Sequence, residues 1–417
     1  MIAREGSDEQ NADGVAVPAP QRSLTLDSVA RFVAEGVFAP TVPGTVGIEL
    51  EWFPLPRVAP TDLHALLPDP MPGGSVVTFE PGGQLELSGP NLPGIAPACS
   101  QMRLDTAAAR AALATRGVEL QGIGLDPRGA RPRVVDSPRY RAMESYFDTE
   151  WPLGRTMMRN TAAIQVNLDI GATADDVDAR WQRAHDLGPV LAAAFANSPF
   201  DANGRPTGWR SARLAVWAAI DPSRTRPACD PGLGASAAYS AYALDAPVMM
   251  IQIDGARSQV LRDPISFARW VDEGHELGWP TVADLEYHLT TLFPPVRPRG
   301  WLELRMLDAL PDEWWPVAVA VTTALFDDPA AAEVATAAAA PVRQSWTAAA
   351  RDALAVPALQ AAAEACFDAA LDAFARLDVD ATSIEATAAY LDRYVARGRC
   401  PADDRLDDDA ARNSTVA

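Results

Sequence analysis

The sequence contains no lysine, so all 35 of its basic residues are arginines. A P-loop requires the lysine of its Gly-Lys-Ser/Thr motif, and Schiff-base catalysis requires a lysine amine, so both are excluded. With 55 acidic residues against 35 arginines, the net charge is −20. This charge argues against nucleic acid as a partner. Small anionic substrates remain possible where arginines and bound cations offset the negative field locally.

Cysteine and histidine are also scarce. The four cysteines are far apart and include no Cys-x-x-Cys pair: Cys99, Cys229, Cys366 and Cys400. This spacing disfavours a thiolate zinc site and a disulfide framework. The four histidines fit neither a His-x-x-x-His nor a Ser/His/Asp arrangement. We therefore expect each histidine at the surface or at a helix cap.

Long apolar runs are missing too. No uninterrupted apolar stretch is long enough to span a bilayer. The first 21 residues are polar and acidic, and they lack the basic start and apolar core of a secretory signal. We therefore expect a cytoplasmic protein that has no membrane partner.

Four short segments alternate between apolar and polar residues, which predicts β-strands. Their polar positions are Glu49 and Glu51 in the first, Glu86 in the second, Gln165 and Asn167 in the third, and Glu303 and Arg305 in the fourth. Strand side chains alternate between faces, so the polar groups of each strand project from one face. Carboxylate and amide oxygens are ligands that Mg²⁺ and Ca²⁺ accept. If the strands share one sheet, its polar face is a platform for a divalent cation; the alternative is an ordinary solvated face.

Arginines accompany these strands. Arg159 precedes the third strand, and Arg213 and Arg224 lie in a tryptophan-containing segment further along. Arginine forks bind carboxylates and phosphates bidentately, which makes these three candidates for substrate binding, although a surface ion pair is the commoner role. Arg305 lies two residues from Glu303 on the same strand face. A metal-binding carboxylate beside an arginine that holds a phosphoryl group suits phosphoryl transfer, so this pair is the catalytic candidate.

The strand patterns run from residue 46 to 308 with helical patterns between them. They predict an α+β fold with a mostly antiparallel sheet covered by helices on one face. We expect a single catalytic domain at 23–400, whose C-terminal part is Ala-rich and helical. Residues 1–22 have the composition of a disordered segment. Residues 401–417 carry five aspartates and are expected to form a flexible acidic tail.

Several motifs together resemble the plant-type glutamate–cysteine ligases. They are GIELE (47–51), EPGGQLELSG (80–89), QVNLD (165–169), ANSPF (196–200), SxRxxxWxxxDxxR (211–224) and ExR (303–305). They occur in the family's order, and the Ala-rich C-terminal third carries none of them. Within the family, the chain is similar to the members that serve ergothioneine biosynthesis in high-GC actinobacteria, a genome type that suits its lysine-free, Ala-rich composition.

The resemblance implies a glutamine-synthetase-like ligase fold and ATP-dependent joining of L-glutamate to L-cysteine. The γ-carboxylate is phosphorylated first, and the cysteine amine then attacks the acyl phosphate to give γ-glutamylcysteine. The implied cofactor is Mg²⁺, and the positions that match the family's metal-binding face are Glu49, Glu51, Glu86, Gln165, Asn167 and Glu303. Arg305 would hold the transferred phosphoryl group, while Arg213 and Arg224 would bind substrate carboxylate or phosphate.

Two alternatives stay open. A related carboxylate–amine ligase with a different amine acceptor would share these motifs, because acceptor selectivity depends on a few pocket contacts. A non-catalytic sensor of Mg-nucleotide or amino acid would keep the platform without turnover. The metal carboxylates and the phosphoryl arginine that such sensors often lose are all present here.

Overall fold

The computed structural model describes residues 24–254, 257–261 and 263–416. Its centre is an eight-stranded antiparallel sheet with the strand order β2-β3-β1-β6-β10-β9, in which β4 and β5 also pair with β1. The strands are β1 (Thr45–Leu55), β2 (Val76–Phe79), β3 (Leu85–Ser88), β4 (Leu92–Pro93), β5 (Glu119–Gln121), β6 (Ala163–Asp169), β9 (Val296–Pro298) and β10 (Trp301–Asp308). The four segments with alternating polarity therefore lie in one sheet, as predicted.

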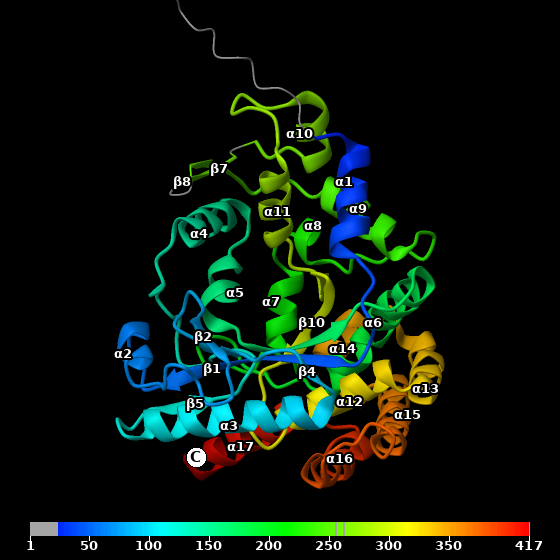
Figure 1. Ribbon diagram of the computed structural model, residues 1–417. Coiled ribbons are helices and arrows are strands. Elements are labelled where there is room, and N and C mark those ends of the chain that lie inside the picture. The colour runs from blue at the N-terminus through cyan, green and yellow to red at the C-terminus, as the bar shows by residue number, and fades with distance from the viewer. Residues whose placement is uncertain (1–23, 255–256, 262, 417) are drawn as a thin grey trace, which may run out of the picture.

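Helices lie on both sides of this sheet (Figure 1). They are α1 (Leu26–Phe32), α2 (Pro60–His64), α3 (Ile95–Ala114), α4 (Pro138–Glu150), α5 (Gly154–Asn160), α6 (Ala174–Ala194), α7 (Ala212–Ala218), α8 (Pro222–Thr225), α9 (Ala235–Asp245), α10 (Phe267–Glu273), α11 (Val282–Thr290), α12 (Trp315–Asp327), α13 (Pro329–Ala339), α14 (Trp346–Arg351), α15 (Pro357–Phe374), α16 (Ala381–Arg393) and α17 (Pro401–Val416). Within the described residues, none of them combines the length and apolarity needed to cross a bilayer.

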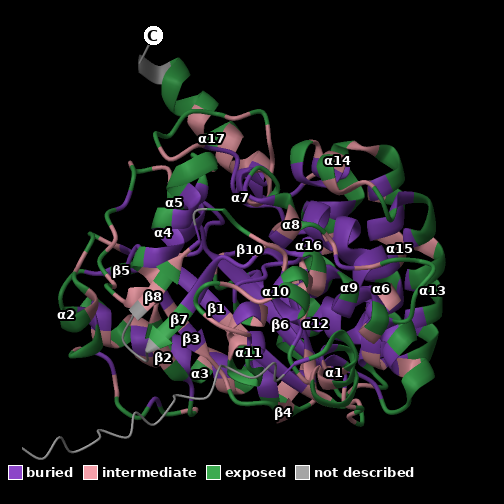
Figure 2. Ribbon diagram, turned by 90° about the horizontal axis from the view of Figure 1, so that it is seen from above, coloured by how far each residue is buried: buried purple, intermediate pink, exposed green. Residues whose placement is uncertain are grey.

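The apolar face of the sheet packs on α3 and α12. The inward residues of β1, Ile48 and Leu50, are at most 2% exposed and share one core cluster with the apolar positions of β6 and β10. Helix α12 is buried along nearly its whole length because its sequence is apolar on every side. Figure 2 shows the buried residues concentrated on the central strands and on α6 and α12. This arrangement leaves the polar face of the sheet for the site.

A second layer stands over the polar face, which corrects the expectation of helices on one face only. Helices α4, α5, α7 and α11 occupy that side, and the hairpin β7 (Met250–Asp254) and β8 (Arg257–Val260) lies above them (Figure 1). The helices that contribute side chains to the polar cavity described below come from this layer. The polar face is therefore partly covered by this second layer of the protein.

The final segment is helical, so the flexible acidic tail expected for residues 401–417 is wrong. Residues up to 416 form α17, and the guanidinium of Arg405 donates to Asn197 Oδ1 at 2.5 Å and to the Gly122 carbonyl at 2.9 Å. Some of its acidic residues are also paired: Asp403 with Arg210 at 2.6 Å and Asp404 with Arg393 at 2.7 Å. These arginines lie outside α17, so the local sequence could not reveal the pairs. The segment 1–22, for which disorder was expected, lies outside the described residues.

Two histidines are in the core, which corrects their expected surface or capping positions. His185 in α6 and His288 in α11 are 4% and 3% exposed. Burial lowers the pKa of His185 to about 4 and that of His288 to about 3. The Nε2 of His288 lies 2.9 Å from the Ala243 carbonyl, whereas its Nδ1 has no hydrogen-bond partner among the described residues. A proton added to this ring would therefore be a buried charge.

These lowered pKa values predict a loss of stability in mild acid. The unfolded histidine binds a proton below about pH 6.5, while the folded one stays neutral, so stability is complete above that pH and falls as the pH decreases. For His288 the loss at pH 5 is about 2 kcal/mol. Urea unfolding of His288→Gln at pH 7.5 and pH 5 should show a pH dependence smaller by about this amount. A pH dependence of stability equal to that of the wild type would contradict a lowered pKa for His288 in the folded protein.

Candidate active site

The register of the sheet gathers its carboxylates on one face. Glu51 lies directly opposite Glu86 in the β1–β3 pair, and Glu49 lies opposite Gln165 in the β1–β6 pair. Glu303 lies opposite Asn167 in the β6–β10 pair. The predicted polar platform thus exists as a continuous row across four strands.

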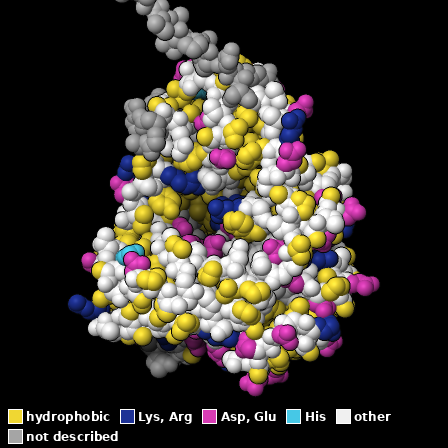
Figure 3. All heavy atoms as spheres, in the orientation of Figure 1, with side chains coloured by type: hydrophobic (Ala, Val, Ile, Leu, Met, Phe, Trp, Pro, Cys, Tyr) yellow, Lys and Arg dark blue, Asp and Glu magenta, His cyan; other side chains and the backbone are white. Residues whose placement is uncertain are grey.

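This row forms the floor of a cavity of about 270 Å³. Helices α4, α5 and α7 border it with Tyr140, Met143, Met157, Met158 and Trp217. Its charged lining consists of Glu49, Glu51, Glu80, Glu86, Arg139, Arg297, Arg299 and Arg305. Figure 3 shows arginine and acidic side chains gathered in a hollow near the middle of the molecule. Both signs of charge therefore meet inside one cavity, as binding of an anion together with a cation would require.

Three carboxylates are close enough to hold a metal ion. One oxygen each of Glu51, Glu80 and Glu86 lies within 4.8 Å of the other two, and we call this set the carboxylate cluster. Glu86 accepts hydrogen bonds from Thr78 Oγ1 at 2.6 Å and from Ser88 Oγ at 3.2 Å. Glu51 accepts from the Ala163 amide at 2.9 Å. An all-oxygen set of this kind fits Mg²⁺ or Ca²⁺.

Glu80 is a candidate ligand that the strand patterns of the sequence do not predict. It follows β2 directly, at the start of the turn Pro81–Gly83, where strand alternation no longer assigns a face. Its position as the first residue of the EPGGQ motif was the available signal. Burial, with the nearby charge of Glu86, raises the pKa of Glu80 to about 7, and burial raises that of Glu51 well above its usual range. A cation would relieve this crowding of buried carboxylates.

Glu49 and Asn167 border the carboxylate cluster without belonging to it. The amide of Asn167 donates to Glu49 Oε1 at 2.9 Å. Burial and the charges of Glu303 and Glu86 raise the pKa of Glu49 to about 7. Asn167 Oδ1 is buried, and no partner for it exists in the described part of the chain. The metal role expected for Glu49, Asn167 and the neighbouring Gln165 stays a prediction.

Glu303 has a different surrounding from the other carboxylates. Its fully buried side chain forms ion pairs with Arg297 at 2.8 Å, with Arg299 at 3.6 Å and with Arg305. Burial alone would raise its pKa, but the three arginines outweigh that effect and lower the pKa to about 2. The structure thus places Glu303 in an arginine group and outside the carboxylate cluster. Its expected metal role stays a prediction.

Arg305 lines the cavity on the same face of β10 as Glu303, beside an irregularity in that strand. Leu304 pairs with Val166 but Leu307 pairs with Ile164, so one extra residue of β10 is accommodated between these pairs. Such bulges redirect side chains and are common beside active sites. Nη1 of Arg305 donates to Gln165 Oε1 at 2.7 Å, which fixes the guanidinium over the platform.

The three other predicted arginines lie in different places. Arg213 donates to the Arg305 carbonyl at 2.6 Å, and it lines a neighbouring apolar cavity together with Trp209, Trp217 and Trp346. Its buried guanidinium also pairs with Asp308 at 3.5 Å. Of the predicted arginines, Arg213 and Arg305 are thus brought together.

The structure brings neither Arg224 nor Arg159 to the cavity lining. Arg224 is completely buried and pairs with Asp221 at 2.8 Å, while Arg159 pairs with Glu144. The substrate-binding roles expected for these two arginines stay predictions, and neither residue lines the cavity. Of the arginines found in the cavity instead, Arg139 lies in α4, while Arg297 and Arg299 lie in or beside the three-residue strand β9. That strand is too short to show an alternating pattern.

Residues 45–415 match the model of glutamate–cysteine ligase family 2. The chain belongs to this family. Its strand motifs, the carboxylate cluster and Arg305 all lie within the matched region. The resemblance inferred from the motifs is therefore confirmed.

Relatives of known name cover nearly the whole chain. The glutamate–cysteine ligase EgtA of Mycobacterium tuberculosis is 42% identical over 413 residues, which is 94% of this chain and 92% of that protein. EgtA of Mycolicibacterium smegmatis is 41% identical and covers 90% and 89% of the two chains. The chloroplastic glutamate–cysteine ligase of Medicago truncatula is 34% identical over 57% of this chain and 48% of its own.

A solved structure shares the fold. The glutamate–cysteine ligase of Francisella tularensis in complex with AMP has a TM-score of 0.51 to this chain at 13% sequence identity. The match covers 88% of this chain and 85% of that chain. The predicted α+β ligase fold with an antiparallel sheet is thereby confirmed.

Proposed function

We propose that this chain is an ATP- and Mg²⁺-dependent glutamate–cysteine ligase that joins the γ-carboxylate of L-glutamate to the amine of L-cysteine. The observation that carries this proposal is that the carboxylate cluster and Arg305 line one cavity. The names of relatives that cover nine-tenths of both chains support it. Resemblance to the ergothioneine-pathway members supports a place for its product in that pathway, and a cytoplasmic location belongs to the same proposal.

The carboxylate cluster would hold the divalent cation. Glu51, Glu80 and Glu86 offer only oxygen atoms, and their crowding favours a cation of charge two. A divalent cation held by these residues would neutralise part of the charge of the carboxylates and of the nucleotide phosphates. Arg139, Arg297 and Arg299 line the same cavity and would hold the remaining anionic groups of ATP and L-glutamate.

The reaction proceeds in two balanced steps. A γ-carboxylate oxygen of glutamate attacks the γ-phosphorus of ATP, and the bond to the ADP oxygen breaks. Arg305 stabilises the charge on the transferred phosphoryl group, because its guanidinium cannot lose its proton and is fixed by Gln165. The cysteine amine, after losing a proton, attacks the acyl carbon, and inorganic phosphate leaves with the bonding electrons. The products are γ-glutamylcysteine, ADP and phosphate.

A coupled ADP-release assay tests this proposal. Purified protein would receive Mg²⁺, ATP and L-glutamate with one amine at a time, and mass spectrometry would identify the product. ADP release that requires L-cysteine, with a γ-linked Glu-Cys product, is the expected result. ADP release with an amine other than L-cysteine would show that the ligase uses a different acceptor. If no amine causes ADP release although Mg-ATP binds, the protein would instead be a sensor.

A further inference from the structure

The position of Glu80 depends on the turn between β2 and β3. Glu51 and Glu86 lie within paired strands and face each other in register, whereas Glu80 stands at the beginning of the turn. Inside the turn, the Gly83 amide donates to the Glu80 carbonyl at 2.8 Å, and Gly83 has a φ of +80°, which favours glycine. Because carboxylates this close repel one another, the turn must be held for Glu80 to stay near its partners.

A buried arginine holds this turn from outside the cavity. Nε of Arg131 donates to the Gly82 carbonyl at 2.8 Å, and the Arg131 amide donates to Asn160 Oδ1 at 3.0 Å. The side chain of Arg131 is only 3% exposed. Just beyond it, the Val134 amide donates to the Pro81 carbonyl at 2.8 Å. Two successive carbonyls of the turn are therefore fixed by one neighbouring segment.

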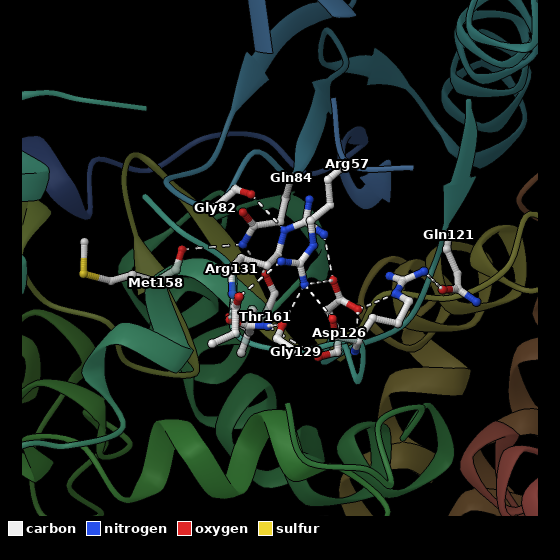
Figure 4. Close-up of polar contacts among 12 residues, drawn as sticks. Arg57, Gly82, Gln84, Gln121, Asp126, Gly129, Arg131, Met158 and Thr161 are labelled. Carbon is white, nitrogen blue, oxygen red and sulfur yellow. Dashed lines mark hydrogen bonds and ion pairs between the residues drawn. The ribbon is translucent and has the colours of Figure 1, made fainter. Parts of the chain in front are cut away.

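Arg131 is itself fixed by a buried carboxylate (Figure 4). Its Nη1 donates to Asp126 Oδ2 at 2.7 Å, and the Asp126 side chain is fully buried. Asp126 also pairs with Arg128 at 2.5 Å, but Arg128 is 30% exposed and donates to Gln121 rather than to the turn. Burying an ion pair costs desolvation free energy, so general stability is a weak explanation for one placed here.

We propose that Arg131 is a positioning residue for the divalent cation: held by Asp126, it fixes the Gly82 carbonyl and keeps Glu80 within reach of Glu51 and Glu86 before the cation binds. With the turn fixed, cation binding does not have to draw Glu80 back against the repulsion of its partners. Without Arg131, that rearrangement would weaken cation binding. This inference rests on the proposed function only in requiring the carboxylate cluster to take a divalent cation.

The affinity for Mn²⁺, measured by electron paramagnetic resonance in the absence of substrates, tests the inference independently of turnover. Arg131→Gln is expected to raise the Mn²⁺ dissociation constant by about 10- to 100-fold, the usual effect of removing a group that orients a metal ligand. In the ligase assay, the KM for Mg²⁺ should rise by a similar factor, while kcat at saturating Mg²⁺ changes much less. Thermal unfolding of the same samples reports whether the protein is folded.

Arg128→Gln is the matched control, because it removes an ion pair to the same Asp126 without touching the turn. Its Mn²⁺ dissociation constant should stay within about twofold of the wild-type value. If Arg131→Gln fails to fold, Arg131→Lys serves instead: it keeps the charge beside Asp126 but lacks the fork that reaches both partners, so the same direction of change is expected. Equal Mn²⁺ affinity of wild type and the Arg131 variant, or equal losses in both variants, would overturn the inference. If the wild type binds no Mn²⁺, the carboxylate cluster is not a cation site at all. This outcome distinguishes a failure of the cation site from a failure of the role proposed for Arg131.

Discussion

Arg305→Ala is expected to lower kcat for ADP release by about 10³-fold, because the transferred phosphoryl group loses its fixed positive charge. The fold should survive the change. Glu303 keeps its ion pairs with Arg297 and Arg299, so no buried carboxylate is left without a partner. Steady-state kinetics at saturating ATP, L-glutamate and L-cysteine, with circular dichroism as a check of folding, measure the effect.

Arg299→Ala provides the comparison for this result. Arg299 lines the same cavity and pairs with the same Glu303, but its side chain is 49% exposed and lies 3.6 Å from that carboxylate. Solvent screens such a charge, so we expect Arg299→Ala to lower kcat by less than about 10-fold. A folded Arg305→Ala enzyme with kcat within about 10-fold of the wild type would remove Arg305 from the catalytic role.

Glu51→Gln is expected to have opposite effects on cation binding and on stability. It removes one of three carboxylates, so Mg²⁺ affinity should fall by about 100-fold or more. It also relieves repulsion among buried carboxylates, and the amide oxygen can still accept from the Ala163 amide. Without Mg²⁺, the variant should therefore unfold at the same temperature as the wild type or at a higher one.

Thermal unfolding across a Mg²⁺ titration measures both effects at once. The wild-type Tm should rise with Mg²⁺, because a ligand that binds only the folded state stabilises it, whereas the Glu51→Gln Tm should stay flat. Glu49→Gln is the comparison, since Glu49 borders the carboxylate cluster without belonging to it and its metal role is a separate prediction. The Tm of this variant should rise with Mg²⁺ as steeply as that of the wild type if the carboxylate cluster alone holds the cation, and less steeply if Glu49 is a ligand too. A Glu51→Gln protein stabilised by Mg²⁺ as strongly as the wild type would refute the carboxylate cluster as the cation site.

The sheet was predictable from the sequence because alternation of polar and apolar residues is a local signal. It placed Glu49 and Glu51 on one face of their strand, and the register of β1 with β3 brings Glu86 to the same face. Glu80 was missed because it starts a turn, where no period assigns a side. Arg297 was missed because its strand has only three residues, the last of which is Pro298.

Burial and long-range pairing could not be predicted in the same way. The sequence shows that Arg224 is charged but not that Asp221 and Thr291 enclose it within the fold. The aspartates of α17 suggested a solvated tail because their partners, such as Arg393, lie in another helix. Such errors follow from long-range contacts, which a single sequence does not record.

The hydrogen bond between Arg405 and the Gly122 carbonyl joins residues 283 positions apart. This separation has a consequence for folding during synthesis. On a ribosome that adds about 5–20 residues each second, β1 waits roughly 20–70 s between its own synthesis and that of Arg405. Strand β10, which pairs with β6, is also missing for most of this interval, so one edge of β6 remains open to pairing with other chains. The last residue that lines the cavity, Arg305, therefore emerges long after β1, and the contact of α17 with the loop at Gly122 forms later still.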